Sequence, residues 1–320
     1  MQKKKLIITL IYAVLSIFMI TACSDSNNGS NNSGNNGGDG SVLPEPKPDP
    51  NAVKEFYHFT TWNNTLRLWQ DSLYAILDNG SLYAWGNNKD GQLGLGLTDE
   101  YVAYNKKVDI PGKVKLIKCA GVDPTDESAC YVITEDGALY VWGKNSYGQL
   151  GVGDEVNKNT PIKVTAINGK VMELIIGYSF SVYAILEDGS LYAWGNNESS
   201  KLGVGDEVNR NTPTKVNLPG KIKKLITSSS ASYAILEDGS LYAWGNNEGG
   251  QLGIGSLEDN INSPTKVTDI NGKVTKVMTF IYVYKEIFST YVDAITYILT
   301  ESSSLYTTNG GDTFSQILFN

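Results

Sequence analysis

The sequence predicts an all-β protein, a β-propeller of about five four-stranded blades that is preceded by a signal peptide and a disordered linker. Three observations predict it. One phrase recurs through most of the chain, short β-rich runs alternate with Asn-Gly and Asp-Gly turns, and the repeated region lacks sustained helical periodicity. A repeat of about 50 residues is typical of folds in which one supersecondary unit recurs, and four strands per unit are typical of propeller blades.

The first 22 residues are expected to be a lipoprotein signal peptide. Three lysines at positions 3–5 precede an apolar run from Leu6 to Ile20, which is short for a membrane span. The following Ile20-Thr21-Ala22-Cys23 is similar to the lipobox of bacterial lipoproteins. That resemblance implies that Cys23 becomes the first residue of the mature protein and carries the lipid. The alternative is an ordinary signal peptide in which a cysteine stands by chance.

Residues 23–50 are expected to form a linker between the lipid and the folded domain. Ser24 to Ser41 is nearly all Ser, Asn, Gly and Asp, a composition that cannot bury enough apolar surface to fold. Pro44 to Pro50 alternates proline with other residues, which favours a stiff polyproline-II spacer.

The folded domain is expected to be residues 51–320. The phrase Tyr-Ala-Ile-Leu-acid-Asp-Gly-Ser-Leu-Tyr-Ala-Trp-Gly recurs there with small variations, and a worn copy follows near the C-terminus. The copies are Tyr74–Gly86, Tyr131–Gly143, Tyr183–Gly195, Tyr233–Gly245 and the worn Tyr297–Gly310. We read each unit as four strands, in which an outer strand comes first; in the third unit these are 161–167, 170–176, 181–186 and 190–195. Asn168-Gly169 and Asp188-Gly189 are read as hairpin turns.

A loop of the form Gly-Asn-Asn-x-x-Gly-Gln-Leu-Gly follows the fourth strand, and in the third unit Ser200-Lys201 replaces Gly-Gln. With this loop, the Asp-Gly turn and the Trp-Gly strand end, the chain resembles the regulator of chromosome condensation repeat family over about residues 70–310. Members usually close seven blades, and this length allows five. Phe314–Phe319 is the expected partner of the first unit, which would close the ring. The alternative is an open arc.

Charge and composition restrict the partners. Without the three signal lysines, 23 basic and 34 acidic residues remain, a net charge of −11. This disfavours nucleic acid and anionic membrane surfaces as partners. His58 is the only histidine, and no nucleophile motif accompanies it, so we expect no enzyme activity and no catalytic residues. The glycine-rich loops lead into no helix, and no His/Cys cluster suits zinc, so we expect no cofactor and no metal.

Three other groups of residues have alternative interpretations. Asp154-Glu155-x-Asn157-x-Asn159, repeated from Asp206, is read as a solvated turn, with a calcium site as the alternative. The repeated tryptophans are read as packing between blades, and not as a ligand cage. Cys119 and Cys130 flank a turn between neighbouring strands of an exported domain, which favours a disulfide over two reduced core cysteines.

Departures from the repeat mark the candidate binding surfaces, because loops on a rigid scaffold carry function. One stretch, 97–107, contains Tyr101 and Tyr104. The other, 278–297, is enlarged and rich in aromatic residues, which are typical interface anchors. Its candidate contact residues are Tyr282, Tyr284, Phe288 and Tyr291. The alternative for 278–297 is a long hairpin that packs on its own blade.

We therefore expect a non-catalytic scaffold, anchored to the membrane by its lipid at the bacterial cell envelope and facing the periplasm or the exterior, that binds a protein. The family resemblance implies the same, since its propellers mostly present loop faces to proteins and secreted bacterial relatives include β-lactamase inhibitors. The founding member's nucleotide-exchange activity is not carried over to an exported acidic chain. The alternatives are a carbohydrate or cell-wall adhesin and, less favoured, an envelope enzyme.

Overall fold

The two most regular runs of the repeat form the central strands of each blade. In the third blade these are β10 (Ser181–Leu186) and β11 (Leu191–Gly195), which pair antiparallel. The turn at Asp188-Gly189 joins them, because Gly189 adopts a φ of +81° that a tight turn requires. All six residues of β10 are buried, so this strand is covered on both faces and lies inside the stack of blades.

The computed structural model describes residues 50–63, 68–97, 99–120, 128–256, 258–285, 290–308 and 313–318. These residues form five four-stranded antiparallel sheets, each built from four strands that are consecutive in sequence. The only helices in the described part are two three-residue 3-10 turns, Tyr178–Phe180 and Glu198–Ser200. The predicted all-β propeller of five blades is confirmed. The signal peptide and almost the whole linker lie outside the described residues.

Each blade runs from a first strand through two central strands to an outer strand. The first blade is β1 (Val53–Asn63), β2 (Leu68–Leu77), β3 (Leu82–Asn87) and β4 (Tyr101–Lys107). The second is β5 (Val114–Ala120), β6 (Ala129–Thr134), β7 (Leu139–Gly143) and β8 (Lys158–Lys163). The third adds β9 (Val171–Ile176) and β12 (Arg210–Lys215) to β10 and β11. The fourth is β13 (Ile222–Thr227), β14 (Ala231–Leu236), β15 (Leu241–Asn246) and β16 (Asn260–Lys266). The fifth is β17 (Val274–Lys285), β18 (Thr290–Thr300), β19 (Leu305–Thr307) and β20 (Ser315–Ile317).

The predicted grouping of strands was wrong by one strand. The outer strand follows the central strands of its blade, as β12 follows β11, and does not precede them. Asn168-Gly169 is therefore a connection between blades and not a hairpin turn. A turn signal fixes a local reversal of the chain but does not tell which flanking strands pair. Backbone bonds hold these connections to the turns of both blades; Val171 donates to Gly137 O, and Glu187 donates to Lys170 O.

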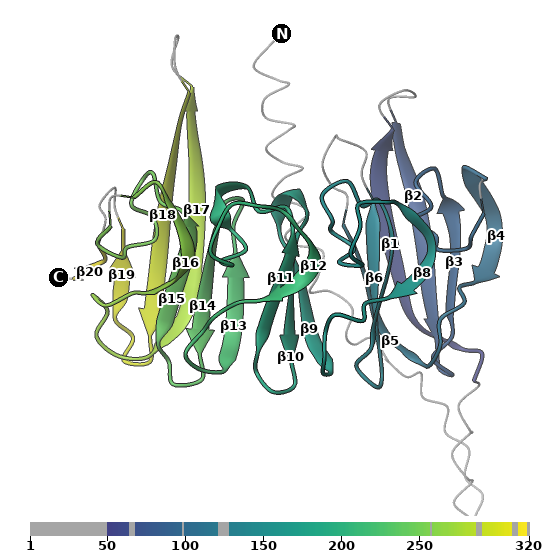
Figure 1. Cartoon of the computed structure of the whole chain (residues 1–320), viewed down its shortest axis with the longest axis horizontal. Coiled ribbons are helices and arrows are strands. Elements are labelled where there is room, and N and C mark those ends of the chain that lie inside the picture. The colour runs from purple at the N-terminus through teal and green to yellow at the C-terminus, as the bar shows by residue number, and fades with distance from the viewer. Residues whose placement is uncertain are drawn as a thin grey trace, which may run out of the picture. The chain divides into compact units, whose positions relative to one another are not determined.

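The predicted closure was also wrong. β20 pairs with β19 and completes the fifth blade, and β1 supplies the upstream strand that the first unit lacked in the sequence reading. In Figure 1 the first blade (purple and blue) and the fifth (yellow) lie at opposite ends of the row of blades. Both terminal blades obtain four strands of their own, so among the described residues no strand is left to join them.

The core lies between neighbouring sheets. Three buried clusters span successive blades: one joins the first and second, one the second and third, and one the third, fourth and fifth. Each contains tryptophan, Trp142, Trp194 or Trp244, with no exposed surface. Since burial of a large aromatic side chain contributes about 2–3 kcal/mol, the tryptophans are a main source of cohesion between blades.

Candidate binding surfaces

A repeated pair of hydrogen bonds, called the latch below, joins each of the first three blades to the next one. The carbonyl of Gln149, in the loop after β7, accepts one bond from the Tyr131 hydroxyl of its own blade at 3.0 Å. It accepts a second from Trp194 Nε1 of the following blade at 2.8 Å. The equivalent donors are Tyr74 and Trp142 on Gln92, and Tyr183 and Trp244 on Lys201. Burial raises the pKa of the Tyr183 hydroxyl to about 12, which keeps it a hydrogen-bond donor.

Close backbone approach makes the latch possible. Gly203, at a φ of +69°, lies under the ring of Trp244, and a Cβ added there would be 2.6 Å from Nε1. A larger residue would push the ring away, so the glycine of Gln-Leu-Gly is a packing requirement. Trp142, Trp194 and Trp244 are therefore fully buried between blades and form no open aromatic cage.

In the fifth blade, Phe314 takes the place of the tryptophan of the latch. The worn repeat has no tryptophan there, and Phe314, just before β20, is 5% exposed. A Cβ on Gly253 would meet its ring, the arrangement that Gly203 has with Trp244. Phe314 thus fills the last inter-blade site, a role that its sequence position did not reveal.

The acidic and asparagine residues of the loops hold the loops together. Asn145 donates to the Asp154 and Val156 carbonyls at 2.7 and 3.2 Å, and the Asp154 carboxylate accepts from Lys158 Nζ at 2.7 Å. That bond to Lys158 holds the pKa of Asp154 below its usual value. Asp206 makes the same contact with Arg210. Among the described residues, no three His, Cys, Asp or Glu side chains gather as metal ligands would. These contacts support the turn reading.

His58 lies on β1 with Nε2 2.9 Å from Asp71 Oδ1 on β2, and both side chains are about half exposed. The pair is a cross-strand contact at the surface of the first blade. Lys201 replaces the glutamine of the other loops in the third loop and is 3% exposed. Burial lowers the pKa of its ammonium group to about 8, although nearby Glu198 acts in the opposite direction.

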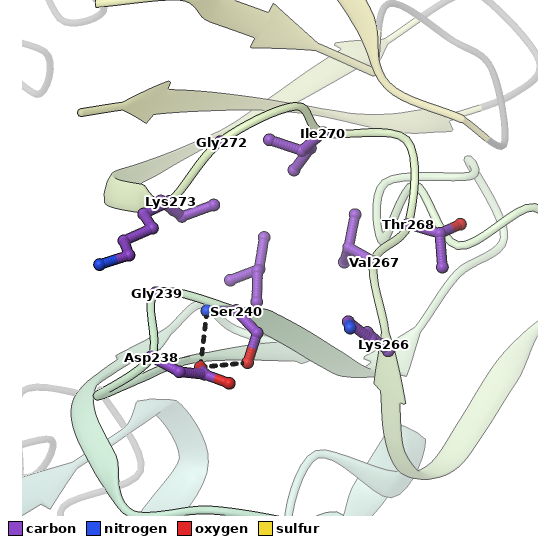
Figure 2. Close-up of a pocket in the computed structure, with 11 residues that line it drawn as sticks. Asp238, Gly239, Ser240, Lys266, Val267, Thr268, Ile270, Gly272 and Lys273 are labelled. Carbon is purple, nitrogen blue, oxygen red and sulfur yellow. Dashed lines mark hydrogen bonds between the residues drawn. The ribbon is translucent and has the colours of Figure 1, made fainter. Parts of the chain in front are cut away.

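A cavity of about 370 Å³ lies at the turn end of the fourth and fifth blades (Figure 2). Asp238 lines it, and its carboxylate accepts bonds from the amide and the hydroxyl of Ser240 at 2.9 and 2.6 Å. Lys266 and Lys273 line the same space. A smaller copy of about 230 Å³ lies between the second and third blades around Asp136 and Lys163. Because this hollow recurs with the repeat, it is a geometric product of blade stacking.

Cys119 on β5 and Cys130 on β6 lie directly opposite each other and are joined by a disulfide in the structure. Cys130 is fully buried, and its sulfur lies 3.3 Å from the Tyr74 hydroxyl of the first blade. The bond therefore joins the first strand of the second blade to a strand that packs on the first blade.

Of the predicted contact residues, Tyr101 and Tyr104 lie together on β4 and are 65% and 82% exposed. Tyr282 and Tyr284 belong to β17 and Tyr291 to β18, which pair as one long hairpin, but their side chains are outside the described part. Phe288 and Cys23 also lie outside the described residues. Within the described part, no helix has the length and apolar character to cross a membrane.

Comparisons with known proteins identify the repeat. The model of the regulator of chromosome condensation (RCC1) repeat matches residues 79–121, 136–184, 188–235 and 238–279, more than half of the chain. Similar curated proteins are the ultraviolet-B receptor UVR8 of Arabidopsis thaliana and the human X-linked retinitis pigmentosa GTPase regulator. The first is 33% identical over 44% of this chain and 31% of its own length, and the second 34% identical over 45% and 14%. This chain thus spans less than a third of these relatives.

Solved structures show the same fold. Human WBSCR16 superimposes with a TM-score of 0.53 at 18% identity, over 78% of this chain and 65% of its own. Yeast RCC1 (Prp20), solved with Kap60, superimposes with a TM-score of 0.50 at 24% identity, over 64% and 49%. With the latch, the turn and the loop recurring in order, the chain belongs to the regulator of chromosome condensation repeat family.

Proposed function

We propose that the protein is a non-catalytic scaffold, exported and lipidated at Cys23, that presents the edges and loop ends of its blades to a protein partner at the cell envelope. The observation that carries this proposal is the contrast between repeated and unrepeated residues. The repeated tyrosines, tryptophans, asparagines and acids are engaged in structural contacts, whereas Tyr101 and Tyr104 interrupt the repeat and stay exposed.

The relatives support a protein as the partner. Yeast RCC1 (Prp20), whose structure superimposes on this chain, was solved bound to the protein Kap60, so a protein partner has a precedent among proteins that contain this fold. Large exposed aromatic residues at a strand edge suit the same role, since tyrosine supplies contact area and a polar tip together. The long β17–β18 hairpin is the second candidate surface, because its strands are longer than the corresponding strands of the second, third and fourth blades.

A pull-down from native envelopes with the full chain tests the partner. The double change Tyr101→Ala with Tyr104→Ala is expected to reduce the captured partner at least tenfold, since each aromatic anchor is typically worth more than 1 kcal/mol. Tyr178→Ala is the matched control, because Tyr178 is also exposed, at 70%, but lies on the third blade. Equal loss with both variants, or binding to glycans that chelators abolish, contradicts the proposal.

Lipidation is tested separately. In cells grown with a clickable palmitate analogue, the wild-type chain is expected to carry the label and to sediment with the membranes. The Cys23→Ser variant is expected to be unlabelled and to be absent from the membrane fraction. A labelled Cys23→Ser chain would exclude Cys23 as the acylated residue.

A further inference from the structure

The outer strand of the first blade lacks a protection that the outer strands of the second, third and fourth blades carry. The four strands align because the lysine that ends each of them pairs with the tyrosine of the neighbouring central strand. Two residues before that lysine, β8, β12 and β16 have Pro161, Pro213 and Pro264. β4 has Asn105 at the same place. Proline on an edge strand removes a backbone donor and blocks pairing with another chain, so β4 alone of the four is open to such pairing.

The position of the first blade also leaves β4 uncovered. In the next three blades, the loop of the preceding blade donates a backbone bond to the outer strand. The bonds run from Gly96 to Asn159 O, from Gly153 to Asn211 O and from Gly205 to Asn262 O, at 2.8–2.9 Å. The equivalent residue of β4 is Ala103, and the part of the chain that the structure describes contains no blade before the first one to donate such a bond. Six of the seven residues of β4 are exposed.

The charges along this strand are self-complementary. Asp99 and Glu100 precede it, Lys106 and Lys107 end it, and all four are exposed. If two β4 strands pair antiparallel about Ala103, Asp99 faces Lys107 and Glu100 faces Lys106, and the symmetry repeats both pairs. Opposite charges across a strand pair are favourable, whereas parallel pairing would place like charges together. A second copy of the same strand is therefore the occupant whose charges fit this edge.

We propose that the protein forms a twofold dimer in which β4 pairs antiparallel with β4 of a second copy. The symmetric contact uses the same patch twice and so stops at two chains. The register of the β3–β4 pairing shifts between Lys106 and Val102 of β4, but the other three outer strands shift at the equivalent place, so the irregularity does not set β4 apart. This inference rests on the proposed binding role and names a second copy of the chain as the partner of the β4 surface, so the protein that the pull-down captures through Tyr101 and Tyr104 is expected to be the chain itself. The β17–β18 hairpin remains the candidate surface for an external partner.

The first test copies the protection of the other blades onto β4. Asn105→Pro introduces the residue that β8, β12 and β16 already carry, so the blade is expected to fold. The full chain in mild detergent, measured by light scattering, is expected to have the mass of two chains, and Asn105→Pro the mass of one. Asn105→Ala is expected to remain dimeric. Near-ultraviolet circular dichroism checks that each variant is folded.

The second test exchanges charges. Asp99→Lys with Glu100→Lys makes the edge entirely basic, and Lys106→Glu with Lys107→Glu makes it entirely acidic. Each double variant alone is expected to be monomeric, and an equimolar mixture is expected to form a mixed dimer. A merely destabilised blade would not be rescued by mixing. Wild-type chains that are monomeric, or variants that all stay dimeric, overturn the inference.

The third test identifies the neighbour of Ala103. Opposite residues of an antiparallel pair lie about 4.5–5.5 Å apart, within reach of a disulfide. In a Cys23→Ser background, Ala103→Cys is expected to give a covalent homodimer on non-reducing gels, and Asn159→Cys, the aligned change on β8, is expected to give none. A covalent product with a different protein would contradict self-pairing and keep the proposed binding role. A chain that remains unlinked would contradict self-pairing, and the pull-down would then decide the binding role independently.

Discussion

At the scale of single residues, the latch between blades accounts for the repeated tryptophans. Trp194→Phe keeps most of the ring but removes the donor to the Gln149 carbonyl. We expect a loss of about 1–3 kcal/mol of unfolding free energy, because a buried hydrogen-bond group is left partly unpaired. Urea unfolding of the variant measures the loss. Trp85→Phe is the control. Trp85 packs on Phe56 at 5.8 Å between ring centroids, and the described residues contain no blade before its own that could accept its bond. A smaller loss of unfolding free energy is therefore expected. Equal losses would show that the latch bond contributes little.

The burial of Lys201 predicts that the stability of the protein depends on pH. Its folded pKa of about 8 lies below its unfolded value of 10.5, so the unfolded chain binds more protons between these two pH values. Stability therefore rises with pH across this window, and the cost of burying the charge is present in full below pH 8. Lys201→Gln, which restores the residue of the other loops, is expected to stabilise the protein at pH 7 and to flatten its melting temperature between pH 8 and 10.5.

The reverse change in the second blade serves as the control. Gln149→Lys is expected to lower the melting temperature at pH 7 and to introduce the same rise with pH. Sequence reasoning noticed the lysine at position 201 as a departure from the repeat. It did not predict the burial, because only the neighbouring blades show that the loop side chain points inward.

At the scale of the strand and its turn, the Cys119–Cys130 disulfide is expected to contribute measurably to the unfolding free energy. Cys119→Ser with Cys130→Ser is expected to lower the unfolding free energy by about 2–4 kcal/mol, since the bond closes a short loop and limits the unfolded chain. Chemical denaturation measures the change, and reduction of the wild-type chain should reproduce it. Two free thiols in the mass of the unreduced protein would contradict the bond.

The sequence revealed the central strands well because the Asp-Gly turn and the repeated apolar and aromatic residues on both sides of it are local signals. The grouping of the strands could not be read in the same way, since Asn168-Gly169 has the residues of a hairpin turn but joins two sheets. β1 was missed because Val53–Asn63 has no copy of the motif. The exposure of Tyr101 and Tyr104 agrees with the expectation that unrepeated residues lie at the surface, while their role as contacts is still a prediction.

At the scale of the whole molecule, the blades form an array in which each one contacts its neighbours. Such arrays lose stability from the place where one interface fails. Phe314→Ala removes the ring that seals the fifth blade, with an expected cost of about 3–5 kcal/mol. Hydrogen exchange is expected to show faster exchange in β17–β20 and unchanged protection in β5–β8. Leu318→Ala, at a residue 77% exposed, is the control. Loss of protection in every blade at once would indicate a single cooperative unit instead.

The latch has a direction along the chain. Each accepting carbonyl is made before the tryptophan that binds it, Gln92 before Trp142 and Gln149 before Trp194. As the polypeptide emerges from a ribosome or a translocon, the accepting carbonyl of the preceding blade is therefore already present when the tryptophan of the next blade appears. The blades can therefore assemble in order from the first to the last. A chain that stops midway exposes only the face of its last folded blade.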